Sequence, residues 1–174
     1  PPAQLTLDPL TANAELQLSQ DLRSISWEGP KEELPPSPER FQFHPCVLGS
    51  RGFSSGWHCW EVEVSSEGLW AIGVATTWAP RQSRSPLKPE EGVWALCHNK
   101  DGYKALTSPN VTSLDNVRGV LRRIRVCVDC EEGRVVFSDL VKKAQIFAFQ
   151  QASFKGEPVY PWFLVMKDAH VQLL

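Results

Sequence analysis

Histidine and cysteine are the side chains of this sequence that could carry acid–base, nucleophilic or metal chemistry near neutral pH. The 174 residues include five cysteines and four histidines: His44, His58, His98 and His170. No histidine lies in a nucleophile elbow or a His-Glu-x-x-His motif, and the sequence has no glycine-rich phosphate loop. A catalytic triad is defined by geometry and not by sequence order, so a missing motif is not proof. We nevertheless predict that this segment is not an enzyme.

Two of the cysteines, Cys127 and Cys130, have the spacing of a metal-binding knuckle or a redox pair. They lie in residues 124–130, which alternate as a β-strand does. Residues three apart on a strand face opposite ways, so the two sulfurs could not hold one ion. We therefore predict reduced, structural thiols with no metal and no cofactor, which favours a cytoplasmic setting. The glycosylation sequon at residues 110–112 argues weakly against that setting.

A tryptophan and an arginine in a predicted loop are the first sign of a binding surface. Residues 76–91 contain Trp78, Arg81 and three prolines, a composition that does not suit the interior of a sheet. Tryptophan buries a large rigid ring and arginine makes several directed hydrogen bonds, so both dominate binding hot spots. We predict that this loop contacts a partner. The alternative is that Trp78 folds back to seal the edge of the core.

Composition argues against several classes of function. The net charge is −2, so no basic surface for nucleic acid is evident. No run of about 18 apolar residues is present, so no segment is predicted to contact or cross a membrane. Arg123 and Arg125 would share one strand face, which we expect to be solvated rather than to bind phosphate. The chain begins Pro-Pro-Ala without a methionine, and we expect one compact domain excised from a longer protein.

Two stretches rich in tryptophan, residues 57–64 and 69–75, organise the predicted core. Apolar residues alternate in both, so each is predicted to be a strand with one side turned inward. The inward sides would carry Trp60, Val62 and Val64 in the first stretch and Trp70, Ile72 and Val74 in the second. The other side of the second stretch has only alanine and glycine, so another layer can pack closely there. Residues 65–68 are polar and end in glycine, which predicts a β-hairpin.

Short alternating runs between turn signals fill the rest of the sequence. The further predicted strands are residues 4–7, 15–19, 23–27, 41–43, 46–48, 92–97, 103–107, 124–129, 134–138, 146–149, 159–165 and 171–174. No window of eleven residues keeps an apolar period of 3.6, so almost no helix is expected. These patterns predict an all-β protein, either a sandwich or a barrel.

Three ordered motifs in the chain resemble the signature motifs of PRY–SPRY domains. They are Leu-Asp-Pro at residues 7–9, Trp-Glu-Val-Glu-Val at 60–64 and Val-Tyr-Pro at 159–161. Further matching segments are residues 38–41, 52–56, 89–96 and 128–133, so the resemblance covers residues 4–174 in order. The third motif departs slightly, because leucine is usual before Tyr-Pro.

The resemblance implies a bent sandwich of two antiparallel sheets, with a PRY segment at residues 1–55 and a SPRY segment at 56–174. It implies that variable loops bind a protein or peptide partner. The parent would be a tripartite-motif ubiquitin ligase active in innate immunity, with zinc only in an upstream RING and B-box. That parent would be a coiled-coil dimer, and the isolated domain a monomer.

Two departures from the family concern the strands at residues 57–64 and 124–130. Trp57 and Cys59 stand where arginine and tyrosine are common, on either side of His58. Cys127 and Cys130 replace common aromatic residues. A ligand known for the family therefore cannot be transferred to that strand face.

Four more candidate partner-binding residues join Trp78 and Arg81, and the resemblance indicates the first three of them. Tyr103, Lys104 and Leu106 lie on a strand that contributes to the concave face in the family, and Lys104 would favour an acidic ligand. A solvated lysine is an equal alternative. Phe154 stands in a polar stretch, either as a contact or as a lid on the core.

Two other readings of the fold remain open. A butyrophilin-like domain could bind a small phosphorylated ligand if four basic side chains converge: His58, Arg81, Arg84 and Lys104. A lectin-like sandwich could stack tryptophan on sugar rings, although paired acidic calcium loops are missing from the sequence.

Overall fold

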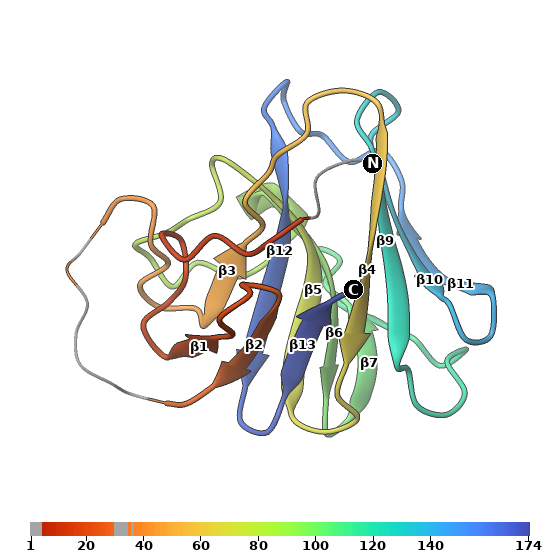
Figure 1. The fold of residues 1–174 in the computed structure, drawn as a ribbon. Helices are drawn as coiled ribbons and strands as arrows, with labels where there is room; N and C mark the ends of the chain where they lie inside the picture. The colour runs from red at the N-terminus through yellow and green to blue at the C-terminus, as the bar shows by residue number, and fades with distance from the viewer. Residues whose placement is uncertain (1–4, 30–34, 36) are drawn as a thin grey trace.

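The computed structural model describes residues 5–29, 35 and 37–174, and this part of the chain is built from β-strands (Figure 1). The strands of the first half are β1 (Leu16–Leu18), β2 (Ser24–Trp27), β3 (Cys46–Leu48), β4 (Trp57–Val64), β5 (Leu69–Thr76) and β6 (Val93–Asn99). Those of the second half are β7 (Gly102–Ala105), β8 (Thr112–Ser113), β9 (Arg123–Asp129), β10 (Arg134–Asp139), β11 (Ala144–Phe149), β12 (Val159–Met166) and β13 (His170–Leu173). The described helical structure is one 3-10 turn, Pro89–Glu91.

The strands form two antiparallel sheets that pack face to face (Figure 1). The seven-stranded sheet has the order β1-β2-β13-β4-β9-β10-β11, and the six-stranded sheet has the order β3-β12-β5-β6-β7-β8. The predicted fold class, an all-β sandwich of two antiparallel sheets with almost no helix, is therefore confirmed.

The strands β4 and β5 do not form the predicted hairpin. β4 pairs with β13 and β9 in one sheet, while β5 pairs with β12 and β6 in the other. Residues 65–68 therefore cross from one sheet to the other. The indole of Trp70 on β5 donates a hydrogen bond to the Ser65 carbonyl of this connection at 3.0 Å. Both strands carry bulky apolar faces, and these faces bury more surface across the interior than they would side by side.

The predicted inward faces are confirmed. Trp60, Val62 and Val64 of β4 and Trp70, Ile72 and Val74 of β5 are all buried in the main core between the sheets. Trp94 of β6 joins them.

The small-residue face of β5 is covered by a second apolar cluster on the outer side of the six-stranded sheet. Ala71 and Ala75 pack there with Phe41, Ala79 and Trp162. This confirms that alanine on that face admits a close layer. It also corrects the predicted strand at residues 41–43, because Phe41 is a buried anchor in a loop and its amide donates to the Thr11 carbonyl at 3.1 Å.

The predicted strand at residues 4–7 is also absent from the described residues. Residue 4 lies outside them, and Leu7 makes only an isolated bridge with Gly49. The predicted outer face of β9 is confirmed, since Arg123 and Arg125 are exposed. Arg125 there makes an ion pair of 2.8 Å with Glu61 of β4.

A disulfide joins Cys59 of β4 to Cys127 of β9, so the prediction of reduced thiols is wrong for these two. The cysteines therefore do not support the cytoplasmic setting that was inferred from them. The strands place the two residues directly opposite each other, with their Cα atoms 4.1 Å apart. Cys46, Cys97 and Cys130 are free thiols. The strand pattern predicted that Cys127 and Cys130 face different ways. Cys127 is bonded to Cys59, whereas the Cys130 sulfur lies 3.7 Å from the Phe53 carbonyl.

We expect the Cys59–Cys127 bond to stabilise the domain. The two cysteines are 68 residues apart, and cross-linking a long loop removes much of the entropy of the unfolded chain. The double variant Cys59→Ala, Cys127→Ala should lose about 2–4 kcal/mol of unfolding free energy in urea. Wild type in a reducing buffer should match it. The single variant Cys130→Ala is the control for a thiol that makes no disulfide, and an equal loss there would contradict the assignment.

Candidate functional site

Trp78 lies just beyond the end of β5, where the Ala79 amide donates to the Thr76 carbonyl and turns the chain. Its indole ring is half-buried and packs edge-on against Trp94, with centroids 6.4 Å apart. The Lys155 ammonium lies 4.8 Å from the centre of the same ring. Trp78 thus packs on the core through Trp94, as the alternative of a seal at the core edge expects, and it also contacts a cation. Its predicted role as a partner contact stays a prediction.

The rings of Trp78 and Trp94 form walls of a cavity of about 330 Å³. Its lining residues come from two loops, β5–β6 and β11–β12, and from the start of β6: Trp78, Pro89, Glu90, Trp94, Gln151, Ser153 and Lys155. We call this the Trp78 cavity. A hollow of this size with aromatic walls and a few polar groups is typical of a binding site.

The polar groups of the Trp78 cavity carry opposite charges. A hydrogen bond from Ser108 lowers the pKa of the Glu90 carboxyl, so Glu90 is anionic at neutral pH. Lys155 supplies a cation over the indole face. The Trp78 indole N–H is buried and has no hydrogen-bond partner in the described structure. The cavity can therefore offer aromatic stacking together with one positive and one negative contact.

Phe154 belongs to the core. Its side chain is only 7% exposed and packs edge-on against Trp94 at 4.9 Å. This burial fits the predicted role of a lid on the core. Three other residues of the same loop line the Trp78 cavity: Gln151, Ser153 and Lys155.

Arg81 fastens two loops together and lies apart from the Trp78 cavity. Its guanidinium stacks over the Phe41 ring at 4.7 Å, and its Nη1 donates to the Glu39 carbonyl at 2.5 Å. Burial lowers the pKa of the guanidinium, although an arginine stays charged at neutral pH. Gln82 adds hydrogen bonds to the Ser37 and Arg40 carbonyls.

Tyr103, Lys104 and Leu106 lie on and beside β7 and are not part of the lining of the Trp78 cavity. Tyr103 faces the interior, where it packs on His98 at 4.9 Å and its hydroxyl accepts a hydrogen bond from the Leu121 amide. Lys104 faces the other way, opposite Cys97. Leu106 packs against the second apolar cluster. The six predicted residues therefore do not converge on one site.

The four basic side chains considered for a phosphorylated ligand also have separate surroundings. His58 stacks on Phe53 at 4.0 Å and its Nε2 lies 2.7 Å from the Ser55 carbonyl. Arg84 stacks over Phe43 at 4.9 Å. Arg81 is held by Phe41, and Lys104 lies on β7. The structure does not favour a shared phosphate pocket built from them.

The described residues contain no cluster of three or more histidine, cysteine, aspartate or glutamate side chains that could hold a metal ion. Over the same residues, no helix has the length and apolar character needed to cross a bilayer.

The sequence matches the SPRY domain family over residues 57–174 and the SPRY-associated domain, PRY, over residues 5–53. It is 44% identical over 165 residues to the pig (Sus scrofa) E3 ubiquitin-protein ligase TRIM15, covering 94% of this chain and 35% of that protein. It is 41% identical to the human zinc finger protein RFP, over 91% of this chain and 31% of that protein. It is 39% identical to mouse butyrophilin subfamily 2 member A2, over 95% of this chain and 32% of that protein. The chain thus spans about a third of the length of these relatives.

Two solved structures are similar to the fold. The stonustoxin structure has a TM-score of 0.84 and 26% identity, covering 99% of this chain and 29% of that chain. The TRIM65 PSpry domain has a TM-score of 0.77 and 23% identity, covering 99% of this chain and 90% of that chain.

We expect Gly92→Ala to displace Trp78 and destabilise the domain. Gly92 has a φ of +81°, and a Cβ there would lie 2.4 Å from the Thr76 Oγ1 and 2.8 Å from the Trp78 Nε1. Urea unfolding should show a loss of roughly 2–4 kcal/mol, and the Trp78 indole N–H resonance should shift.

Gly156→Ala is the matched control for this strain. Gly156 has a φ of +74°, but a Cβ there would meet nothing within 4 Å. Its substitution should therefore cost only about 1 kcal/mol, the cost of the left-handed backbone. Equal losses for the two variants would show that Gly92 does not position Trp78.

Proposed function

The chain belongs to the SPRY domain family and carries the PRY segment, and from this we propose that it holds a protein or peptide partner at the Trp78 cavity. SPRY domains are interaction modules and not catalysts. The observation that supports this location is the half-buried indole of Trp78, which stands between the core and an open cavity with Lys155 over its ring.

The surroundings of Trp78 fit a binding anchor. Its loop is tied to residues 37–42 by Arg81 and Gln82, and the Gln42 amide donates to the Arg81 carbonyl at 2.8 Å. A loop that is already ordered loses little entropy when a partner binds. The cavity therefore suits a partner that inserts an apolar or aromatic side chain beside Trp78.

The charges of the cavity suggest how the partner is oriented. Lys155 favours a carboxylate or carbonyl oxygen, and Glu90 favours a donor on the opposite side of the inserted side chain. We propose that these two contacts select the direction in which a peptide crosses the cavity.

We further propose that the parent chain is a tripartite-motif ubiquitin ligase and that this domain recognises its substrate in the cytoplasm. The likeness to TRIM15 and to RFP supports this proposal. In such a chain, zinc would bind in an upstream RING and B-box, and a coiled coil would make the dimer. The likeness to butyrophilins keeps a membrane-anchored parent as the second candidate.

Trp78→Ala should abolish partner capture. The experiment is quantitative affinity capture from cytosol with wild type and two variants, Trp78→Ala and Trp57→Ala. Trp57 is 51% exposed on β4 and belongs to the other sheet, so its loss controls for a generally less apolar surface. Loss of a tryptophan at a hot spot costs about 2 kcal/mol or more, which is a roughly thirtyfold weaker affinity.

The supporting result is a set of proteins captured by wild type and Trp57→Ala but lost with Trp78→Ala. Circular dichroism must show that all three proteins are folded. Capture that is equally strong with folded Trp78→Ala would place the partner elsewhere on the domain.

A further inference from the structure

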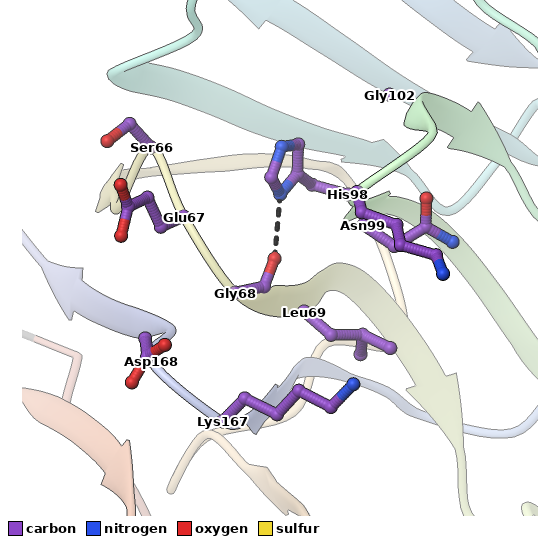
Figure 2. Close-up of a pocket in the computed structure, with 10 residues that line it drawn as sticks. Ser66, Glu67, Gly68, Leu69, His98, Asn99, Gly102, Lys167 and Asp168 are labelled. Carbon is purple, nitrogen blue, oxygen red and sulfur yellow. Dashed lines mark hydrogen bonds between the residues drawn. The ribbon is translucent and has the colours of Figure 1, made fainter.

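A larger hollow lies at the opposite ends of β5 and β6 from the Trp78 cavity. Its volume is about 610 Å³, and three chain connections surround it. Two of them, between β4 and β5 and between β12 and β13, cross from one sheet to the other, while the third is the β6–β7 hairpin. The lining residues are Ser66, Glu67, Gly68, Leu69, His98, Asn99, Lys100, Gly102, Lys167 and Asp168 (Figure 2). We call this hollow the crossover pocket.

The crossover pocket is distinct from the Trp78 cavity. β5 runs from Leu69, which lines the pocket, to Thr76, two residues before Trp78. Seven steps of a strand at about 3.3 Å each separate the two ends by roughly 20 Å. A ligand in the pocket therefore does not reach the tryptophan end of the sandwich.

The walls of the crossover pocket are held together by hydrogen bonds between the connections. The His98 Nδ1 lies 2.9 Å from the Gly68 carbonyl (Figure 2). Ser65 donates its amide to the His170 carbonyl, and its hydroxyl accepts from the His170 amide at 2.9 Å. A Cβ on Gly68 would lie 2.3 Å from the Ala169 amide nitrogen, so the two crossing connections are in close contact. The pocket is therefore formed before any ligand binds.

The imidazole of His98 is fixed in one orientation. It packs against Trp70 at 5.6 Å and against Tyr103 at 4.9 Å, and these two rings also contact each other at 6.1 Å. The Gly68 carbonyl can only accept a hydrogen bond, so Nδ1 carries a proton and donates it.

The charges around the crossover pocket are balanced and separated. Figure 2 shows Glu67 and Asp168 on one side of Gly68, while Lys167 extends the other way, past Leu69. Lys100 follows Asn99 on the β6–β7 turn. Two carboxylates and two ammonium groups give a net charge of zero. In the described part of the chain none of the four makes an ion pair.

We propose that the crossover pocket binds a short peptide segment in which an acidic and a basic side chain lie close together. The acidic side chain would bind Lys167 and Lys100, and the basic one would bind Glu67 and Asp168. Leu69 also lines the pocket (Figure 2), and it can contact the methylene groups of the acidic or the basic side chain of the peptide. A phosphate or a polyamine would meet repulsion from one half of the pocket, so a dipolar ligand is the class that fits.

The test is a titration of the labelled domain, followed by amide NMR shifts, with two synthetic probes. These are acetyl-Glu-Gly-Lys-amide and acetyl-Lys-Gly-Glu-amide, one for each direction of the chain. We expect at least one of them to shift the amides of residues 66–69, 98–102 and 167–169 with an affinity near 1 mM. Probes in which glutamine replaces either charged residue should bind roughly two- to fivefold more weakly, because each loses contacts to one half of the pocket.

Lys167→Gln is the variant that tests the pocket, and Lys143→Gln is its matched control. Both lysines occupy turns with left-handed backbone, at φ values of 58° and 56°, but Lys143 is not part of the pocket lining. Lys167→Gln should weaken the preferred probe roughly two- to fivefold, and Lys143→Gln should leave its affinity unchanged.

Three outcomes would overturn the proposal. The first is no shift in these amides at about 10 mM of either probe. The second is binding that Lys167→Gln leaves unchanged. The third is pyrophosphate shifting the same amides more strongly than the peptides, which would make the pocket an anion site.

Discussion

The packing of β4 against β5 across the interior is the constraint on which the rest of the structure depends. Each strand turns a row of large apolar side chains inward, and each is central in its own sheet. The connection at residues 65–68 must therefore cross the sandwich, and the connection from β12 to β13 crosses beside it. These two crossings lie at the end of β5 that is opposite Trp78.

The apolar layer on the outer face of β5 explains why the loop that carries Trp78 is ordered. Alanine at positions 71 and 75 leaves room for Phe41 and Ala79 to pack on the six-stranded sheet. Phe41 in turn lies under the Arg81 guanidinium, so the loop after β5 is held to the segment before β3. The position of Trp78 thus depends on two alanines of a central strand, because larger residues there would lift the layer that carries its loop.

Alternation along the chain was sufficient to predict an all-β protein and its buried faces, and the family resemblance added the sandwich of two sheets. Alternation did not show which strands are neighbours. A period of two tells which side chains share a face and nothing about the strand beside them. For this reason the pattern predicts a hairpin at residues 65–68, where the chain crosses between the sheets. It also gives no sign that Cys59 pairs with Cys127. Trp78 could be singled out because a tryptophan among prolines is unusual. Lys155 and the crossover pocket could not, because they depend on turns that are distant in sequence.

The two hollows share strands β5 and β6 but rest on different groups of rings. Trp94 supports Trp78 at one end, while Trp70 supports His98 and Tyr103 at the other. Most of the residues between them are buried and belong to a close-packed core, which resists small displacements. Energetic coupling between sites requires an element with two arrangements that both sites can bias. A continuous pair of hydrogen-bonded strands offers no such element, so binding at one end should add to binding at the other without altering it. A longer partner that occupies both ends would then gain affinity through linkage alone.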